Sequence, residues 1–202
     1  MTDLTKTATV PAVARLVFAP AVHHLILDVA ADAGAPLYAA TFGGPAAEIE
    51  DDGNGTVTIT RRGPMHPFDV ARRSAHVTLN PTAAWDIEIQ GAATHLEADL
   101  TGLHLNSLSV GGGLTDARIT LPHTDRTVPI HFASGVRKTT ILRPVTTRAT
   151  LTGEQGFTSL SLDGRWVGTV ATIDWQSTEP AAGTPGCYAV TLDAGSNHLT
   201  LG

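Results

Sequence analysis

The strongest constraint on the fold of this chain is an internal repeat with a period of about 21 residues. Each copy contains a short strand, a glycine corner, a few small or polar residues and a second short strand. Corresponding first-strand positions are 21, 22, 21 and 39 residues apart, the last gap being close to two periods. They are Ile87, Leu108, Ile130, Leu151 and Val190. Such a period without helical signals is typical of stacked repeats, because one unit cannot bury its apolar face alone.

The second strands repeat in the same way, at intervals of 23, 22, 19 and 39 residues. Their positions are Leu96, Ile119, Ile141, Leu160 and Leu199, and an earlier, degenerate copy is Leu16-VFAPAVHHLI-Leu27. The long final gap contains the hairpin-turn dipeptide Asp163-Gly164 and two aromatic residues, Trp166 and Trp175. It predicts an irregular rung or an inserted hairpin at 163–185.

Strict alternation of apolar and polar residues, as in Val57-Thr58-Ile59, indicates half-buried strands throughout. We therefore predict an all-β fold, a single-domain β-solenoid of rungs of about 21 residues covering 1–202. Residues 1–82 would form degenerate N-terminal rungs and a cap, and 83–202 the regular repeats. The alternative is a β-sandwich, which is less favoured because that fold does not demand internal repetition.

The repeats also resemble a known family. The segments that carry the resemblance are Trp85-DIEIQGAATHLEADLTGL, Leu108-SVGGGLTDARITLP, Val128-PIHFASGVRKTTILRP, Phe157-TSLSLDGRWVGTV and Tyr188-AVTLDAGSNHLTLG. They look like a bacterial family of β-strand-repeat "putative adhesin" domains, which is similar to the toast-rack domain of cell-wall-stress response proteins. The resemblance implies a β-helix-like stack often linked to the cell envelope. It implies no functional residues, because the motifs are patterns of strands and corners.

Charge argues against nucleic-acid binding. The net charge is −6, all of it in residues 1–100, and residues 101–202 are neutral. A phosphate-binding protein needs a basic face. The most basic stretch holds Arg118, Arg126, Arg137, Lys138, Arg143 and Arg148, which we interpret as a solvated surface, with an anionic ligand as the alternative. Because the chain shows neither a signal peptide nor about 20 consecutive apolar residues, we expect a cytoplasmic protein without membrane insertion.

The sequence predicts no catalytic, cofactor-binding or metal-binding residues, and we do not expect an enzyme. The nine histidines form no HxH or HExxH motif, and His23 and His24 should point to opposite faces of a strand. The acidic run at 48–52 lacks the spacing of a calcium loop. Asp86, Glu88, Glu97 and Asp99 alternate with apolar residues as on an ordinary solvent face. The single cysteine, Cys187, excludes a disulfide framework.

A further pattern lies just before the second-strand anchors. These positions should stack into one outward column, a solvated face or an ion-binding ladder. They are His24, His95, Arg118, Thr140, Ser159 and His198.

The last repeat reaches the end of the chain, and an uncovered rung would expose unpaired backbone groups. This suggests a non-enzymatic structural or interaction protein, a rigid scaffold that self-assembles through its open terminal rung. Its partner would be itself, as a homo-oligomer, or another protein. The candidate interface is Tyr188, Val190, Leu192, Leu199, Leu201, Trp166 and Trp175. Two alternatives remain: the 163–185 insertion masks that edge, and the chain is a regulatory or sensory binding module of an envelope-stress type system.

Overall fold

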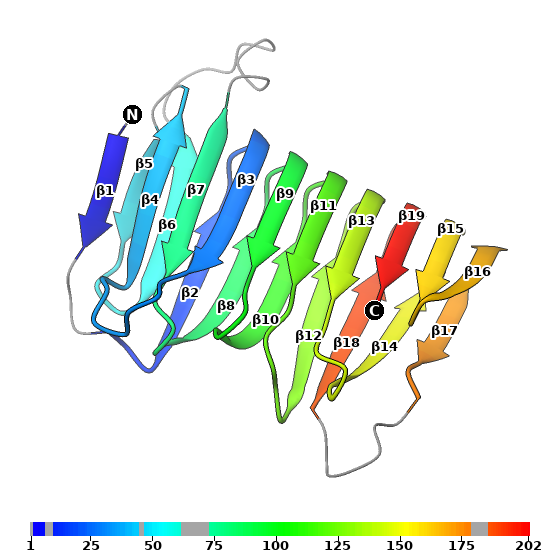
Figure 1. The fold of residues 1–202 in the computed structure, drawn as a ribbon. Helices are drawn as coiled ribbons and strands as arrows, with labels where there is room; N and C mark the ends of the chain where they lie inside the picture. Colours follow the sequence, from blue (N-terminus) through cyan, green and yellow to red (C-terminus); the bar gives the residue numbers. More distant parts are fainter. Residues whose placement is uncertain (1, 7–9, 45–46, 62–72, 179–185) are drawn as a thin grey trace.

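The computed structural model describes residues 2–6, 10–44, 47–61, 73–178 and 186–202, which form strands and no helix (Figure 1). The predicted all-β class is confirmed, and the described ranges contain no apolar helix that could span a bilayer. The strands are β1 Thr2–Lys6, β2 Val13–Phe18, β3 Val22–Val29, β4 Tyr38–Gly43, β5 Ala47–Asp51, β6 Thr56–Arg61, β7 Ser74–Leu79, β8 Ala84–Ile89, β9 Ala93–Asp99, β10 His104–Val110, β11 Leu114–Thr120, β12 Thr127–Phe132, β13 Val136–Leu142, β14 Arg148–Gly153, β15 Phe157–Leu162, β16 Arg165–Val170, β17 Ile173–Gln176, β18 Cys187–Leu192 and β19 Ser196–Leu201.

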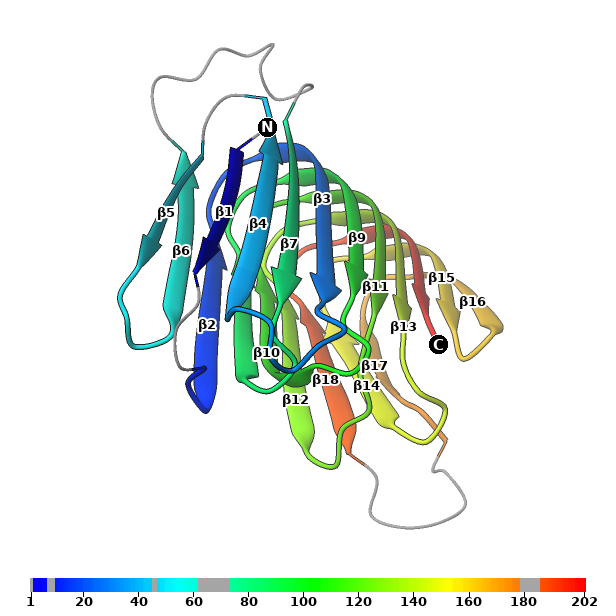
Figure 2. The same ribbon diagram turned by 60° about the vertical axis from the view of Figure 1, so that its left-hand side comes forward.

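Two mixed sheets face each other across one apolar core (Figure 2). Sheet A has ten strands in the order β1-β4-β7-β3-β9-β11-β13-β19-β15-β16. Sheet B has nine, in the order β17-β14-β18-β12-β10-β8-β2-β6-β5. From β8 to β13 consecutive strands alternate between the sheets, so that each pair forms one layer, which we call a rung. Neither sheet closes into a barrel.

Parallel pairing in the middle of each sheet gives way to antiparallel pairing at both ends. In sheet A, the strands from β7 to β15 pair in parallel, and β4 and β16 join them antiparallel. In sheet B, β5 and β17 are the antiparallel end strands. The pairing of β15 with β16 also contains register irregularities. Short or irregular end strands of this kind blunt the edges of a sheet against pairing with other chains.

The first-strand anchors stack in register, as their spacing predicts. In sheet B, Leu16 pairs with Ile87, Ile87 with Leu108, and Leu108 with Ile130. The same column continues through Val190 to Leu151. All six side chains are at most 2% exposed. A strand repeat therefore places one apolar side chain above another, and this column forms the centre of the core on the sheet B side.

The second-strand anchors, by contrast, belong to two columns. Leu96 pairs with Ala117, and Ile119 pairs with Ala98 and Ile141. Leu160 and Leu199 pair with each other. Leu199 faces Thr139, so the anchors Ile119 and Ile141 lie two residues further along their strands than the others. The assignment of all five to one column was wrong, because apolar residues recur at two inward positions of each strand.

The position of the C-terminal strands differs most from the prediction. β18 lies between β12 and β14, and β19 lies between β13 and β15, so both have neighbours on each side. The last rung is therefore internal, and the prediction of an open terminal rung was wrong. The end of the stack is formed instead by β16 and β17, from the described part of the 163–185 insertion. The insertion strands cover β14 and β15, not the last rung, so the alternative in which the insertion masks the edge of the last rung also differs from the structure.

A buried asparagine ties the N-terminal part of the stack to the regular rungs. Asn80 is fully buried just after β7. Its Nδ2 donates to the carbonyl of Ala35 (2.6 Å), and its Oδ1 accepts bonds from the backbone N–H and hydroxyl of Thr82. Its carbonyl accepts a bond from the indole N–H of Trp85 (2.9 Å), which is also fully buried. One side chain thus fixes the β3–β4 loop against the turn that precedes β8.

Replacing Asn80 by alanine should lower the free energy of unfolding by about 3 kcal/mol, because a fully buried side chain and its three hydrogen bonds to Ala35 and Thr82 are lost together. Urea denaturation followed by circular dichroism measures the change. Asn54→Ala is the matched control, since Asn54 is exposed in the β5–β6 turn; its effect should stay within about 0.5 kcal/mol. Equal losses for the two variants would contradict the structural role of Asn80.

Candidate interaction surfaces

A groove of about 900 Å³ crosses the corner at which the rungs pass from sheet B to sheet A. It runs over the starts of β11, β13, β19 and β15, and the end of β16 closes one end through Thr169, Val170 and the following Ala171. Its floor contains one glycine from each of the four rungs. They are Gly113, Gly135, Gly195 and Gly156. The repeated glycine corner of the sequence thus becomes a continuous channel across neighbouring strands.

The backbone of this floor is already hydrogen-bonded between rungs. The Leu114 N–H donates to the carbonyl of Gly135 (3.3 Å), and the Val136 N–H donates to that of Gly195 (3.3 Å). The Ser196 N–H donates to the carbonyl of Gly156 (3.0 Å). A ligand in the groove would therefore bind through side chains rather than by adding a strand to an unpaired edge.

A column of polar side chains lines the groove. Thr115 pairs with Arg137, Arg137 with Asn197, and Asn197 with Thr158, so that all four lie side by side on neighbouring strands. All four are exposed. The Asn197 Nδ2 donates to the hydroxyl of Thr158 (3.0 Å). Among the described residues, the Arg137 guanidinium forms no ion pair or hydrogen bond, and the lining contains no carboxylate.

The next column has an unusual backbone. Asp116, Lys138, His198 and Ser159 have φ values of 61°, 48°, 58° and 57°, in the left-handed region that residues other than glycine seldom adopt. In each strand the left-handed residue is an extra residue that the pairing skips, so two consecutive side chains face outward, as in a β-bulge. In β13 these are Arg137 and Lys138, both exposed. Four neighbouring strands share the distortion, which widens the polar surface beside the groove.

The predicted outward column is correct in part. His24 pairs with His95, and His198 and Ser159 occupy the matching positions of β19 and β15. Arg118 and Thr140, however, pair with each other two residues further along their strands. Asp116 and Lys138 take their places. The prediction failed there because it counted back from Ile119 and Ile141, which belong to the other apolar column.

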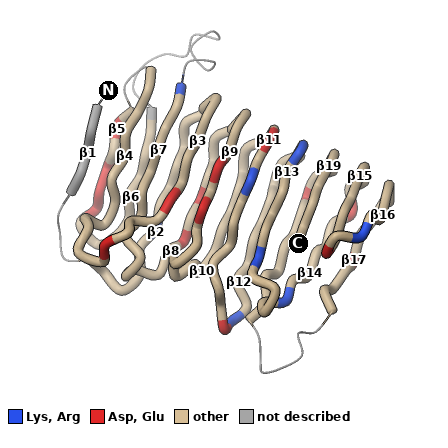
Figure 3. The backbone as a smooth tube through the Cα atoms, viewed as in Figure 1, with Lys and Arg blue, Asp and Glu red and all other residues tan. Residues whose placement is uncertain are grey.

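The basic stretch divides into two groups. Arg126 bonds to the Asn106 side chain, the largely buried Arg143 forms an ion pair with Asp163 (2.5 Å), and Arg148 also has a partner. The other three cations are exposed on interior strands of sheet A: Arg118 on β11, and Arg137 and Lys138 on β13. Figure 3 shows that acidic residues lie toward β3 and β9, whereas basic ones follow on β11 and β13. The charge asymmetry of the sequence thus becomes a charge gradient along the sheet.

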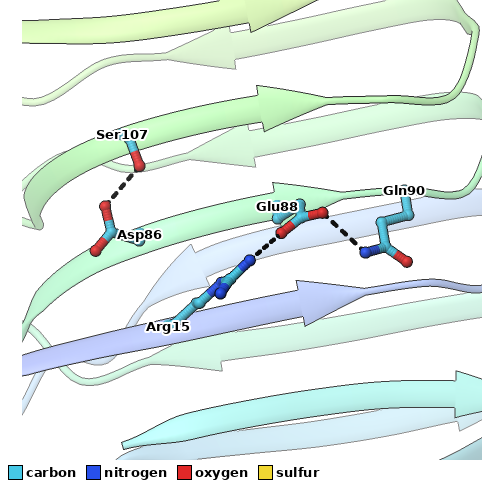
Figure 4. Close-up of polar contacts among 5 residues, drawn as sticks. All are labelled: Arg15, Asp86, Glu88, Gln90 and Ser107. Atoms are coloured by element: carbon cyan, nitrogen blue, oxygen red, sulfur yellow. Dashed lines mark hydrogen bonds and ion pairs between the residues drawn. The ribbon is translucent and has the colours of Figure 1, made fainter. Parts of the chain in front are cut away.

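A second polar surface lies on sheet B, over a shallow depression of about 470 Å³ (Figure 4). Arg15 on β2 forms an ion pair with Glu88 on β8 (2.6 Å), and Gln90 donates to the same carboxylate (2.8 Å). The Ser107 hydroxyl donates to Asp86 (2.6 Å). The hydrogen bond from Gln90 and then that from Arg15 hold the pKa of Glu88 below its ordinary value. A carboxyl group that acts as a general acid needs a raised pKa, whereas the pKa of Glu88 is lowered.

The other acidic candidates are dispersed. Asp86 and Glu88 lie on β8 in sheet B, whereas Glu97 and Asp99 lie on β9 in sheet A. In the run at 48–52, the Asp52 carboxylate accepts bonds from the backbone N–H groups of Asn54 (2.7 Å) and Thr56 (2.9 Å). These bonds, that from Thr56 foremost, lower the pKa of Asp52. The acidic run therefore forms a turn between β5 and β6.

Several of the histidines each pair with one carboxylate. His76 contacts Asp28 (2.6 Å), His95 contacts Asp116 (3.0 Å) and His131 contacts Asp193 (2.8 Å). In the ranges that the structure describes, no three His, Cys, Asp or Glu side chains gather closely enough to hold a metal ion. His66 lies outside those ranges.

His23 and His24 do not point to opposite faces, as alternation predicted. Both rings meet that of His95, with centroids 4.9 and 6.2 Å away. The cause is visible in β3, where two consecutive positions between buried Val22 and Leu25 are only half-buried.

The predicted interface residues fall into two groups that differ in how far they are buried. Those on the last rung are at most 2% exposed and belong to the core: Tyr188, Val190, Leu192, Leu199 and Leu201. They cannot contact a partner in the folded state. Trp175 pairs with Leu151 and packs against the end of the core. Trp166, which is 69% exposed, pairs with Ser161 on the outer face of sheet A and is the remaining candidate contact. Cys187, half-buried at the start of β18, is a free thiol.

Comparison with known proteins supports the resemblance that the repeats predicted. Residues 45–142 match the family model described as the N-terminal domain of toast-rack, DUF2154. The predicted resemblance to the toast-rack domain is thereby confirmed. The toast-rack match spans β5 to β13 and includes the β11 and β13 side of the groove, whereas β19 and β15 lie beyond it. No curated protein matches the chain.

Two solved structures resemble this fold to different degrees. A "putative cell adhesion protein" from Clostridium sporogenes superposes with a TM-score of 0.73 over 100% of this chain and 98% of its own, at 15% identity. A "putative adhesin" from Bacteroides fragilis aligns over 99% of this chain and 97% of its own, at 9% identity and a TM-score of 0.36. The first likeness shows a shared fold, and the second is too weak to support any conclusion.

Proposed function

We propose that this chain is a non-enzymatic interaction module, a rigid β-solenoid whose binding surface is the groove on sheet A. The observation that supports this most strongly is the column from Thr115 to Thr158, which presents exposed polar side chains on four consecutive strands. Backbone ladders on both sides of each strand hold the column rigidly, so little conformational entropy is lost when a partner binds. The toast-rack match and the adhesion-related fold relative are consistent with this role.

Self-assembly through the last rung is not part of the proposal. β18 and β19 already pair on both sides, and antiparallel strands occupy both ends of the stack. This arrangement favours the second candidate, a regulatory or sensory binding module that awaits a partner. Light scattering separates a self-assembling scaffold from such a module, because a capped module should give a mass near 21.0 kDa. Discrete larger oligomers would restore the scaffold hypothesis.

Amide chemical shifts test the binding surface. We would titrate the ¹⁵N-labelled protein with four probes: oligogalacturonate, cellotetraose, an acidic octapeptide and a basic octapeptide. At least one probe should shift amides near the groove, at 113–115, 135–137, 156–158 and 195–197. The Gly113→Leu variant, which places a side chain in the groove, should abolish these shifts. Shifts confined to sheet B, or none with any probe, would contradict the proposed surface.

A further inference from the structure

We propose that the groove on sheet A binds a linear acidic glycan, a polysaccharide chain that carries carboxylate groups, laid across the strands. This inference rests on the proposed function and specifies its ligand class. It follows from three properties of the groove: the direction in which it runs, the groups that it offers and its charge.

The direction favours an extended polymer. The groove crosses β11, β13, β19 and β15, and neighbouring strands in a sheet are about 4.8 Å apart, so the polar column spans about 14 Å. Its side chains recur at every strand. A chain of linked sugar rings, which presents hydroxyl groups at regular intervals, can hydrogen-bond to several members of such a column at once.

The groups that line the groove favour a glycan over a peptide. Peptides that bind sheets usually add a strand through unpaired backbone groups, with pockets for alternate side chains. Here the floor backbone is already paired between Leu114 and Gly135, and likewise across the other rungs. What remains available are the hydroxyls of Thr115 and Thr158, the amide of Asn197 and the guanidinium of Arg137. These are donors and acceptors for hydroxyl and carboxylate groups.

The charge favours an acidic chain. Arg137 lines the groove and has no internal partner among the described residues, and the exposed Lys138 follows it. The nearest acidic residue on the left-handed column, Asp116, is paired with His95 at 3.0 Å. A guanidinium forms two parallel hydrogen bonds with a carboxylate, which suits recognition of a uronate group.

The test is isothermal titration calorimetry with oligogalacturonate of about four sugars, beside neutral cellotetraose of the same length. Oligogalacturonate should bind at least about tenfold more tightly than cellotetraose, and more weakly as salt is raised. Arg137→Gln should weaken its binding about tenfold, as expected for a lost charged hydrogen bond. The matched control is Arg15→Gln, which removes one positive charge on sheet B and should leave the affinity unchanged.

The outcomes separate the ligand class from the binding surface. Equal weakening by Arg137→Gln and Arg15→Gln, or no binding of oligogalacturonate, would overturn the acidic-glycan proposal. If another of the four probes still shifts amides at the groove, the proposed function stands and only the ligand class is wrong. If no probe shifts those amides, both proposals fail together.

Discussion

Deletion of residues 188–202 should unfold the domain. These residues form nearly all of β18 and β19, which separate β12 from β14 and β13 from β15. Their removal takes out one complete interior layer of the core, and β12, β13, β14 and β15 each lose the neighbour on one side. We expect loss of the β-sheet circular dichroism signal and of any cooperative thermal transition. A deletion variant that keeps both, with an unchanged midpoint, would show that the last rung is peripheral.

Point substitutions on the same rung test this expectation without removing backbone. Tyr188 is fully buried, and its hydroxyl donates to the carbonyl of Pro122 (2.6 Å). Tyr188→Ala should cost about 3–5 kcal/mol, as for other large aromatic side chains in cores. Tyr188→Phe should cost about 1–3 kcal/mol, because it leaves only the carbonyl unpaired. Trp166→Ala, at an exposed site, is the control and should change stability little.

The second large effect should come from a single added methyl group. At Gly112, a Cβ would lie 2.3 Å from the carbonyl carbon and oxygen of Gly91, which are backbone atoms and cannot rotate away. Gly112→Ala should therefore destabilise the protein by about 3 kcal/mol or more through forced separation of neighbouring rungs. At the adjacent Gly113, the nearest atom to a new Cβ would be the carbonyl oxygen of Gly135, at 3.6 Å, an ordinary contact.

The adjacent glycine is the matched control. Gly113→Ala should be neutral or should stabilise the protein by up to about 1 kcal/mol, since alanine restricts the unfolded chain. Guanidinium denaturation of the two variants gives the comparison. Similar stabilities for Gly112→Ala and Gly113→Ala would contradict the close approach of rungs at Gly112. The contrast also bears on the groove, because Gly113 can accept a side chain without strain and so provides a way to fill the channel.

The sequence predicts the rungs better than their order. The spacing from Ile87 to Leu151 correctly places these residues in one column of sheet B, because one apolar side chain must stack on the next, and it gives the neighbours correctly as far as Ile130. The final gap of 39 residues looked like two periods, with Val190 beyond Leu151. In the structure Val190 lies between Ile130 and Leu151 instead. Each rung carries much the same apolar face, so local patterns do not encode which neighbour it takes.

The candidate surface was also only partly predictable. The basic stretch was visible, yet its division into paired and free cations depends on contacts between distant rungs, such as that between Arg143 and Asp163. The left-handed residues were not foreseen, because Lys138 and Ser159 have no special preference for that conformation. A usable signal existed in Asp116 and His198, two of the residue types that adopt it more readily.

Hydrogen–deuterium exchange resolved by mass spectrometry is the most direct test of the claim that β18 and β19 lie inside the stack. Peptides covering β18 and β19 should exchange among the slowest in the protein, because their amides are paired in the interior of both sheets. Peptides covering β16 and β17 should exchange much faster, as end strands with one paired side. Exchange of β18 and β19 as fast as that of β16 and β17 would contradict this account, since it would return the last rung to the open end.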